Sequence, residues 1–301
     1  MGTALNRMRI GILTVKNHRY HPNRRLIETA RRLNHEPILI HPGKLCLSAG
    51  RDGLRTVWLC RESRPDVLLP RIGATIKEYG LTAIRHFELQ GIPLVNRYEA
   101  ILLARNKFLT AQCLCGKGLP VPETLYASNW ANFGEAVSRL GGFPVVVKIS
   151  RGRQGSGVLL VGSTHSSRDL LREHLQRDRG VLIQRYIPPE GRRDFRLLVV
   201  GTEVVGAMEL KPVKGDFRSN IHLGGKATKL GVGGKMFSLA LRSSRAIGLD
   251  IAGVDVIQDQ YGNPWVMEVN YSPGFKGLEV CTGIDVAQSI IRLAVKRAKE
   301  A

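Results

Sequence analysis

Three oxygen-bearing side chains stand on two short β-branched segments that are predicted to pair as a hairpin. Asp255 belongs to the first segment, and Glu268 and Asn270 belong to the second. Gly262 and Asn263, which lie between the segments, form a favourable two-residue turn. A turn centred there places Asp255 opposite Asn270. Glu268 then lies two residues along on the same face, because strand side chains alternate with a period of two.

The chemistry of these three side chains suggests a metal site. Carboxylate and amide oxygens are hard ligands, which suit Mg²⁺ bound together with the phosphates of a nucleotide. The competing interpretation is a solvated polar face that holds no metal. The opposite face of the hairpin is apolar and is expected to meet a core; it carries Val254, Val256, Met267 and Val269.

A lysine followed by a glycine-rich loop is suited to phosphate. Lys148 ends a β-branched strand, where its ammonium group could meet phosphate oxygens while N–H groups of the loop cover them. The loop contains Gly152, Gly155, Ser156 and Gly157. It has no following Lys-Ser/Thr and lies between strands, so neither a P-loop nor a Rossmann nucleotide-binding turn is predicted. Taken alone, the loop is equally typical of a flexible hairpin turn.

Two basic loops could contact a phosphoryl group or a substrate. Arg218 with Ser219 and Asn220 places a permanently charged fork beside two small polar side chains, which suits clamping of a transferring phosphoryl or acyl-phosphate group. An exposed turn is the alternative. The run from Arg192 to Arg196 offers one carboxylate among several cations at a loop-to-strand junction. Ion pairing within the run is the more common outcome of such a sequence.

Three successive units are predicted to position these groups. A strand, a helix and a second strand over residues 8–41 indicate a βαβ unit with a parallel sheet, and short strands are expected at residues 57–59, 66–69 and 93–96. One helical segment at residues 99–116, which ends in glycines and prolines, opens the next unit. Later β-branched runs indicate an antiparallel set covered by two helices. The predicted domains are residues 1–96, 97–184 and 185–301.

Composition limits the class of protein. Of the 301 residues, 43% are hydrophobic and 23% are charged, which excludes collagen-like, coiled-coil and largely disordered chains and predicts a soluble globular protein. A net charge of +20 indicates an anionic partner. No run approaches the roughly 18 apolar residues of a membrane span, and five scattered cysteines indicate reduced thiols. A cytoplasmic location without membrane attachment is therefore expected.

These features occur together with motifs that resemble the ATP-grasp superfamily over residues 8–297. The motifs are, in chain order, Lys107, Val-Val-Val-Lys148 with the glycine-rich loop, Leu-Ile-Gln-Arg-Tyr186, Asp194-Phe-Arg196, Gly-Asp-Phe-Arg-Ser-Asn220, Ala-Gly-Val-Asp255 and Met-Glu-Val-Asn270-Tyr-Ser-Pro-Gly274. Three more are similar to the RimK-like ligases, which add glutamate to the C-terminus of a ribosomal protein: Pro70-Arg-Ile-Gly73, the Arg218 loop and Thr282-Gly-Ile-Asp285.

The resemblance implies an ATP-grasp fold, of mixed α/β and α+β class, with a Rossmann-like pre-ATP-grasp domain first. ATP would lie between the central and C-terminal domains. The residues implied to bind the nucleotide are Lys107, Lys148, Gly155, Ser156, Gly157, Arg185, Tyr186, Asp194, Arg218, Ser219 and Asn220. The implied ligands of two Mg²⁺ ions, for which Mn²⁺ could substitute, are Asp255, Glu268 and Asn270. Lys148 and Arg218 would act in catalysis, and Arg71 and Arg196 would contact substrate.

Individual roles within the nucleotide site also follow from the resemblance. Lys107 and Lys148 would contact phosphates, Asp194 would bind the ribose, and the main chain at Arg185 and Tyr186 would contact adenine. Arg185 stands where these relatives usually have Glu, so the resemblance implies a main-chain contact to adenine there and not a side-chain contact.

The expected function is ATP-dependent ligation of an amine to a carboxylate. An acceptor carboxylate attacks the γ-phosphate of ATP to give an acyl phosphate and ADP, and the amine of L-glutamate then forms the amide and releases phosphate. The resemblance implies the acidic C-terminus of a ribosomal protein as acceptor, and a homo-oligomer such as a tetramer. Two alternatives stay open: the same chemistry on a small-molecule or carrier-protein acceptor, and a basic ribosome- or RNA-binding protein with a vestigial ATP site.

Overall fold

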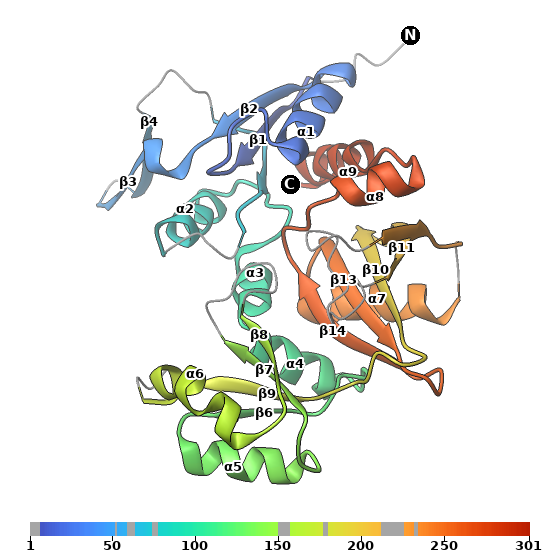
Figure 1. The fold of residues 1–301 in the computed structure, drawn as a ribbon. Coiled ribbons are helices and arrows are strands. Elements are labelled where there is room, and N and C mark those ends of the chain that lie inside the picture. Colours follow the sequence, from blue (N-terminus) through green and yellow to red (C-terminus); the bar gives the residue numbers. More distant parts are fainter. Residues whose placement is uncertain are drawn as a thin grey trace.

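The computed structural model describes residues 7–51, 53–58, 64–73, 78–149, 157–176, 180–211, 226–231 and 234–301. Five predicted site residues lie outside these ranges, namely Gly155, Ser156, Arg218, Ser219 and Asn220. The described chain is organised around three larger sheets (Figure 1). In that view the N-terminal sheet lies at the top, a central sheet in green and yellow lies at the bottom, and a third sheet lies at the right.

The N-terminal sheet is parallel, in the order β2-β1-β5. β1 (Arg9–Leu13) lies between β2 (Glu36–Ile40) and β5 (Val67–Pro70). The connecting helix α1 (His21–Arg32) has a proline in its first turn, and its apolar side chains share a core with β1 and β5. The predicted βαβ unit is therefore confirmed.

The rest of this unit departs from the sequence-based expectation. The strand expected at residues 57–59 is the end of an antiparallel hairpin whose first strand was not predicted. The strand expected at residues 93–96 is reduced to a single parallel bridge between Leu68 and Leu94. The remaining elements of this unit are η1 (Pro42–Lys44), β3 (Leu45–Gly50), β4 (Gly53–Trp58) and α2 (Glu78–Leu89).

The helical segment expected at residues 99–116 is two helices rather than one. α3 (Tyr98–Arg105) ends at Asn106, and α4 (Lys107–Gly116) begins directly after it. The Oδ1 atom of Asn106 accepts hydrogen bonds from two backbone N–H groups of α4, at 3.0 and 3.1 Å. This N-cap favours a new helix start, because it satisfies donors that a helix leaves unpaired at its first turn. The single-helix prediction was wrong, and the break sets the position of Lys107.

The central sheet is antiparallel, in the order β6-β9-β7-β8. Its elements are β6 (Thr124–Ala127), α5 (Trp130–Arg139), β7 (Val145–Ile149), β8 (Val158–Val161), α6 (Thr164–Gln176) and β9 (Val181–Arg185). The two helices pack on the sheet through a separate apolar core that includes Phe133, Val147 and Leu171. Because Lys148 follows Val147 in β7, its side chain leaves the sheet on the face opposite this core.

The third sheet is antiparallel, in the order β12-β11-β10-β13-β14. Its elements are β10 (Arg193–Val200), β11 (Glu203–Lys211), β12 (Lys226–Lys229), α7 (Lys235–Ile247), β13 (Ile251–Gln258), β14 (Pro264–Asn270), α8 (Lys276–Thr282) and α9 (Val286–Glu300). α7 packs on one face of the sheet, and α8 and α9 pack on the other. α9 also contacts β5 and α1, so this helix joins the third sheet to the N-terminal sheet (Figure 1).

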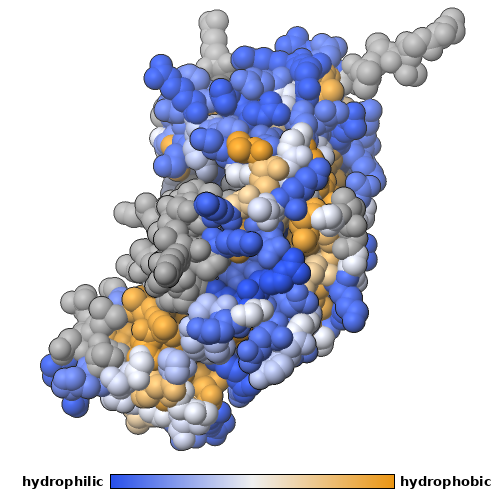
Figure 2. Space-filling view, turned by 45° about the vertical axis from the view of Figure 1, so that its right-hand side comes forward, coloured by the Kyte–Doolittle hydropathy of each residue, from blue (hydrophilic) through white to orange (hydrophobic). Residues whose placement is uncertain are grey.

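The surface agrees with the charge balance of the chain. The face in Figure 2 is mostly hydrophilic, and its hydrophobic patches gather mainly in the lower part of the view. None of the helices in the described ranges is both long enough and apolar enough to span a membrane.

Candidate active site

The hairpin that carries the predicted metal ligands has a different turn from the one expected. The backbone N–H of Asp259 donates to the Asn263 carbonyl, and the N–H of Gly262 donates to the Asp259 carbonyl, both at 3.0 Å. Residues 260–262 therefore form a three-residue loop, in which Gly262 has a φ of +85°. This left-handed position closes such loops and favours glycine. The prediction of a two-residue turn at Gly262 and Asn263 was wrong.

A bulge between Asp255 and Val256 changes the register a second time. As a result Asp255 lies directly opposite Glu268, and Asn270 lies opposite Gly253. The predicted pairing of Asp255 with Asn270 is corrected accordingly.

The predicted cluster nevertheless forms. Nδ2 of Asn270 is within 3.4 Å of Oδ2 of Asp255, so the three oxygen-bearing side chains share one face of the hairpin. The apolar face is corrected at one position: Val266, 2% exposed, enters the core, while Met267 lines the pocket instead.

Arg196 covers the carboxylate of Asp255. The two residues are cross-strand partners on β10 and β13. Nε and Nη2 of Arg196 donate to the two carboxylate oxygens, both at 2.7 Å, in a bidentate pair. The negative charge of Asp255 raises the pKa of Arg196 despite the opposing effect of burial. Sequence analysis assigned Arg196 to substrate, and its present partner is one of the predicted metal ligands.

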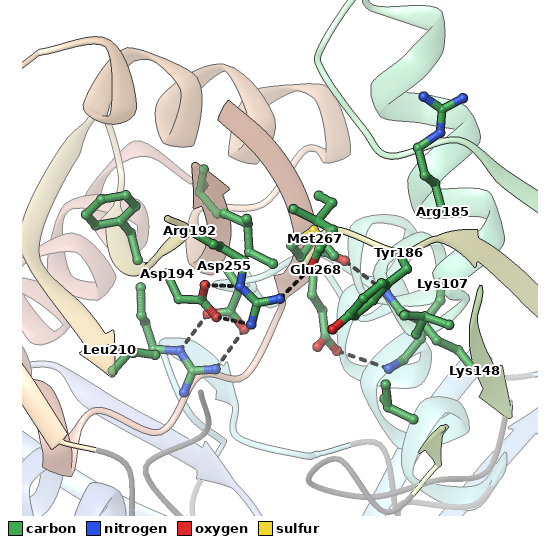
Figure 3. Close-up of a pocket in the computed structure, with 17 residues that line it drawn as sticks. Lys107, Lys148, Arg185, Tyr186, Arg192, Asp194, Leu210, Asp255, Met267 and Glu268 are labelled. Carbon is green, nitrogen blue, oxygen red and sulfur yellow. Dashed lines mark hydrogen bonds and ion pairs between the residues drawn. The ribbon is translucent and has the colours of Figure 1, made fainter. Parts of the chain in front are cut away.

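Two lysines from different elements face Glu268. Nζ of Lys107 lies 3.6 Å from Oε1 of Glu268, and Nζ of Lys148 lies 3.5 Å from the carbonyl oxygen of Met267 (Figure 3). Burial acts to raise the pKa of Glu268, but Lys107, Lys148 and Arg196 together hold it below its ordinary value. Burial, reinforced by the charge of Lys107, lowers the pKa of Lys148 to about 8. Lys107 and Lys148 therefore place two positive charges beside the carboxylate of Glu268.

Asp194 is held by Arg192, within the charged run in which the sequence predicted ion pairing. Nε and Nη2 of Arg192 donate to its two carboxylate oxygens at 2.7 and 3.2 Å, and the two side chains are only 5% and 9% exposed. Nη1 of Arg192 also donates to the Ile187 carbonyl at 2.9 Å. Arg192 thus ties the segment after β9 to the start of β10. The charge run predicted an ion pair, but not the burial that makes this one costly to break.

Arg185 and Tyr186, which were predicted to contact adenine through their main chain, place their side chains differently. Tyr186 lies within the group of pocket side chains, whereas the guanidinium of Arg185 points away from them (Figure 3). Nη2 of Arg185 instead donates to Oε2 of Glu123 at 2.7 Å, and its backbone N–H donates to the Glu123 carbonyl at 2.9 Å. Burial raises the pKa of Tyr186. The Arg185 side chain therefore holds the end of β9 against Glu123.

One pocket between the central and third sheets collects most of the predicted residues. Its polar lining consists of Lys107, Lys148, Arg185, Tyr186, Arg192, Asp194, Arg196, Asp255 and Glu268. Apolar side chains such as Val146, Ile187 and Leu210 complete the walls. Gly157 lies next to β7, where its carbonyl accepts a hydrogen bond from the Ile149 N–H at 2.8 Å, and Arg71 lies in the N-terminal unit.

The donor set fits magnesium. Asp255, Glu268 and Asn270 supply hard oxygens from facing strand positions, which is the ligand chemistry that Mg²⁺ prefers. Within the described part of the chain, no group of three or more His, Cys, Asp or Glu residues could hold a metal ion, so the predicted site consists of two carboxylates and one amide. The pocket combines apolar walls, two lysines whose charge suits phosphate, and a cluster of hard oxygen ligands. This combination is typical of an enzyme that uses a nucleotide together with a divalent cation.

Asn96 is a positioning residue that no sequence pattern indicated. Its side-chain amide donates to the carbonyls of Ile251 and Tyr271, both at 2.8 Å, and its Oδ1 accepts from the Ile251 N–H at 2.7 Å. Asn96 is 1% exposed. It therefore ties the end of the N-terminal unit to β13 and to the residue that follows Asn270.

Comparisons with known proteins agree with this geometry. Residues 8–101 match the family described as the RimK PreATP-grasp domain, and residues 104–294 match the RimK-like ATP-grasp domain. A protein of Syntrophotalea carbinolica named "Probable alpha-L-glutamate ligase" is 38% identical over 294 residues, which cover 97% of each chain.

Solved structures show the same fold. A RimK domain ATP-grasp protein from Sphaerobacter thermophilus has a TM-score of 0.72 at 25% identity, covering 95% of this chain and 99% of that one. The ATP-grasp ligase PsnB, complexed with a minimal precursor, has a TM-score of 0.74 at 18% identity and covers 96% and 98% of the two chains.

The fold and the pocket define an ATP-dependent ligase. More narrowly, the chain belongs to the RimK-like ATP-grasp family, as both matched domains and the relatives in full-length alignment show. Enzymes of this kind use ATP and Mg²⁺. The sequence-based expectation of an ATP-grasp fold with an N-terminal pre-ATP-grasp domain is confirmed; the domain limits at residues 96 and 184 stay a prediction.

Proposed function

We propose that this enzyme adds L-glutamate to the C-terminal carboxylate of an acidic-tailed protein, such as a ribosomal protein, through an acyl phosphate. The observation that carries the proposal is the placement of Asp255 and Glu268 across one hairpin, with Lys107 and Lys148 turned to the same pocket. The full-length likeness to proteins named as probable alpha-L-glutamate ligases supports glutamate as the donor.

The pocket residues suit a reaction between two anions. Lys107 and Lys148 offset the repulsion between an acceptor carboxylate and the triphosphate, and Lys148 stays near the transferring group because it is held at the Met267 carbonyl. Arg196 is assigned to substrate: once Asp255 has another cation to bind, the guanidinium fork is free for a carboxylate or acyl phosphate. Arg218 is expected to clamp the same group.

The nucleotide is proposed to lie along the pocket wall. The main chain at Arg185 and Tyr186 contacts adenine, and Asp194 binds the ribose from its rigid position against Arg192. Gly155, Ser156 and Gly157 cover the phosphates, with Ser219 and Asn220 beside them. Two Mg²⁺ ions, held by Asp255, Glu268 and Asn270, supply charge neutralisation and orientation of the phosphates.

The acceptor assignment depends on charge. The chain carries a net charge of +20, which favours an acidic protein tail and a product that gains carboxylates. Structural neighbours include a ligase complexed with a precursor peptide, which is a further reason to favour a peptide acceptor over a small molecule. A homo-oligomer is expected from the family resemblance.

The test is ADP release by the full chain with MgATP and L-glutamate, with and without a peptide that ends in glutamate. Mass spectrometry follows the peptide in the same reaction. The matched control is the same peptide with a C-terminal amide, which removes the acceptor carboxylate and leaves the rest of the sequence unchanged. L-aspartate in place of L-glutamate controls for the donor.

Each outcome has a distinct meaning. Stepwise mass gains of a glutamyl residue on the free peptide, with none on the amide, support the proposal. ADP release that leaves the peptide unmodified contradicts the protein acceptor and redirects the search to small-molecule or carrier acceptors. Absence of ADP release with any acceptor, together with RNA binding that falls steeply with salt, favours the binding-protein alternative.

A further inference from the structure

A second cavity borders the same chain segment as the ligase pocket. Its volume is about 780 Å³, which lies in the range of cavities that hold small molecules. Its walls come from α4, from the segment between α4 and β6, from the segment that follows β9, and from the tip of the β13–β14 hairpin. Residues 185–187 line both cavities. The guanidinium of Arg185, which points away from the ligase pocket (Figure 3), belongs to the lining of the second cavity.

Hydrogen bonds fix the hairpin that forms one wall of the second cavity. The N–H of Val266 in β14 donates to the Pro120 carbonyl at 2.8 Å, which ties the hairpin to the segment after α4. At the hairpin tip, Asp259 accepts hydrogen bonds from Nε1 of Trp265 and from the N–H of Tyr261, both at 3.0 Å. The tip is therefore an ordered part of the wall, and Asp259, Tyr261 and Trp265 all line the cavity.

The lining of the second cavity is rich in aromatic side chains. Four of its 18 residues are aromatic, against 6% of the whole chain: Phe108, Tyr186, Tyr261 and Trp265. Tyr261 is 79% exposed, so its ring is accessible to a ligand that enters from solvent. Further apolar surface comes from Ala111, Val121, Pro122, Ile187 and Pro188. An apolar stem of a ligand therefore has surface to cover.

The second cavity is also acidic, although the chain carries a net charge of +20. Among the described residues, its lining contains the carboxylates of Glu123, Glu190 and Asp259 and a single cation, Arg185. Arg185 is engaged by Glu123 through a hydrogen bond of 2.7 Å. Neither Glu190 nor Asp259 forms an ion pair with another described residue. The hydrogen bond from Trp265 lowers the pKa of Asp259, so its charge persists at neutral pH.

Aromatic rings and uncompensated carboxylates together favour a cation. The face of an aromatic ring attracts an ammonium or guanidinium group, and an apolar stem that carries such a group can cover the apolar lining. An anionic nucleotide, in contrast, is repelled by the carboxylates. The ligand preference of the second cavity is therefore opposite to that of the ligase pocket, where Lys107 and Lys148 favour phosphate.

We propose that the second cavity binds an ammonium or guanidinium group that is carried on an apolar stem. The group belongs either to a small free amine or guanidine or to a lysine or arginine side chain of a peptide, because both present the same chemistry. The inference goes beyond the ligase reaction and does not depend on which donor or acceptor the enzyme uses.

The test is a heteronuclear NMR titration of the full chain, saturated with MgADP so that the ligase pocket is occupied. The indole N–H signal of Trp265 reports the cavity; it is one of three tryptophan signals, and Trp265→Phe assigns it by its loss. The ligands are n-pentylammonium, n-pentanol, which has the same length and no charge, and a capped peptide in which lysine alternates with glycine.

Two variants and one control accompany the titration. Glu190→Gln removes an uncompensated charge from the lining, and Tyr261→Leu keeps apolar bulk but removes the ring. Both residues are exposed, so neither change should disturb folding. The matched control is Glu203→Gln, which removes an exposed acid at the start of β11, outside the cavity.

We expect n-pentylammonium to shift the Trp265 signal and n-pentanol to bind at least tenfold more weakly. Glu190→Gln and Tyr261→Leu should each weaken n-pentylammonium binding by about three- to fivefold, as the loss of one charge or one ring contact predicts. Tighter binding of the peptide per ammonium group identifies a protein side chain as the source, and tighter binding of n-pentylammonium identifies a free cation. Equal binding of n-pentanol, unchanged affinity in both variants, an equal loss in Glu203→Gln, or no shift of the Trp265 signal would overturn the inference.

Discussion

Arg196 and Arg71 are both withdrawn from solvent, yet they experience opposite electrostatic environments. Arg196 meets Asp255 through two hydrogen bonds of 2.7 Å, and the carboxylate raises its pKa. The Arg71 guanidinium donates to the Pro273 carbonyl and lies over the Phe275 ring, and burial lowers its pKa to about 10. In the ligase pocket each acid is already paired with a cation of the chain, whereas Arg71 is a buried cation that no acid contacts among the described residues.

The contrast extends to the other pocket carboxylates. Glu268 faces Lys107, and Asp194 is paired with Arg192. The cations around Glu268 hold its pKa below its ordinary value. We propose that a divalent ion exchanges with a side-chain cation in this pocket rather than entering a site of unopposed charge. We propose that the same exchange frees Arg196 for the anions of the reaction.

The largest expected effect comes from removing the acid of the Arg196 pair. Asp255→Asn should lower acceptor-stimulated ADP release by about a thousandfold, because the metal supplies several kcal/mol and each 1.36 kcal/mol corresponds to a factor of ten. Steady-state ADP assays measure the effect. Asp250→Asn, which removes the acid of the Arg297 pair outside the pocket, should stay near wild type. Near-normal turnover in Asp255→Asn would show that Asp255 is not a metal ligand.

The next effect is on stability. Asp194→Asn leaves the charge of Arg192 buried beside a neutral amide, which should lower the free energy of unfolding by about 3–5 kcal/mol. Glu135→Gln breaks an exposed pair with Arg139 and should change it by less than about 1 kcal/mol. Denaturant unfolding compares the two. Equal effects would mean that burial of the Arg192 pair has no energetic consequence.

A smaller effect concerns the pH dependence of nucleotide affinity. Burial lowers the pKa of Lys148 to about 8, so the free enzyme loses this positive charge as pH rises through 8. If phosphate binds the charged form, affinity for ADP should fall about tenfold between pH 7 and pH 9. The folded state should not be weakened by Lys148 over this range, because deprotonation removes the cost of burying its charge. Titration calorimetry measures the affinities.

Lys148→Arg is the matched variant for this dependence. Its guanidinium keeps its charge to well above pH 9, so the tenfold fall should disappear in the variant. A wild-type affinity that is constant from pH 7 to pH 9 would exclude Lys148 as the charged phosphate contact.

The smallest effect is expected at Arg71. Arg71→Met should leave the free energy of unfolding within about 1 kcal/mol of wild type, because loss of the Pro273 hydrogen bond is offset by removal of an uncompensated buried charge. The same denaturant measurement applies. A loss as large as that in Asp194→Asn would show that Arg71 serves the fold, and the contrast with Arg196 would not hold.

Most of the pocket residues could be predicted from the sequence, but the geometry of the pocket could not. Asp255, Glu268 and Asn270 could be assigned to one polar face because strand alternation is a local rule. The register could not be predicted, because the bulge at Asp255 depends on Val266 entering the core in place of Met267. Packing against the rest of the sheet decides such a choice, and no single strand contains that information.

The amino-acid sequence by itself determined the chemistry available to this protein: hard oxygens on a hairpin, lysines for phosphate, an excess of positive charge, and a helix break that Asn106 makes through its own side chain. These are properties of residue types and short spacings. Only the tertiary structure decided which charged side chains contact one another. Arg196 pairs with Asp255, 59 residues further along the chain, and Arg71 contacts Pro273 across 202 residues with no acid beside it in the described ranges. Such contacts depend on how whole sheets and helices pack, so the pairing of one arginine and the lack of an acid beside the other become visible only in the folded chain.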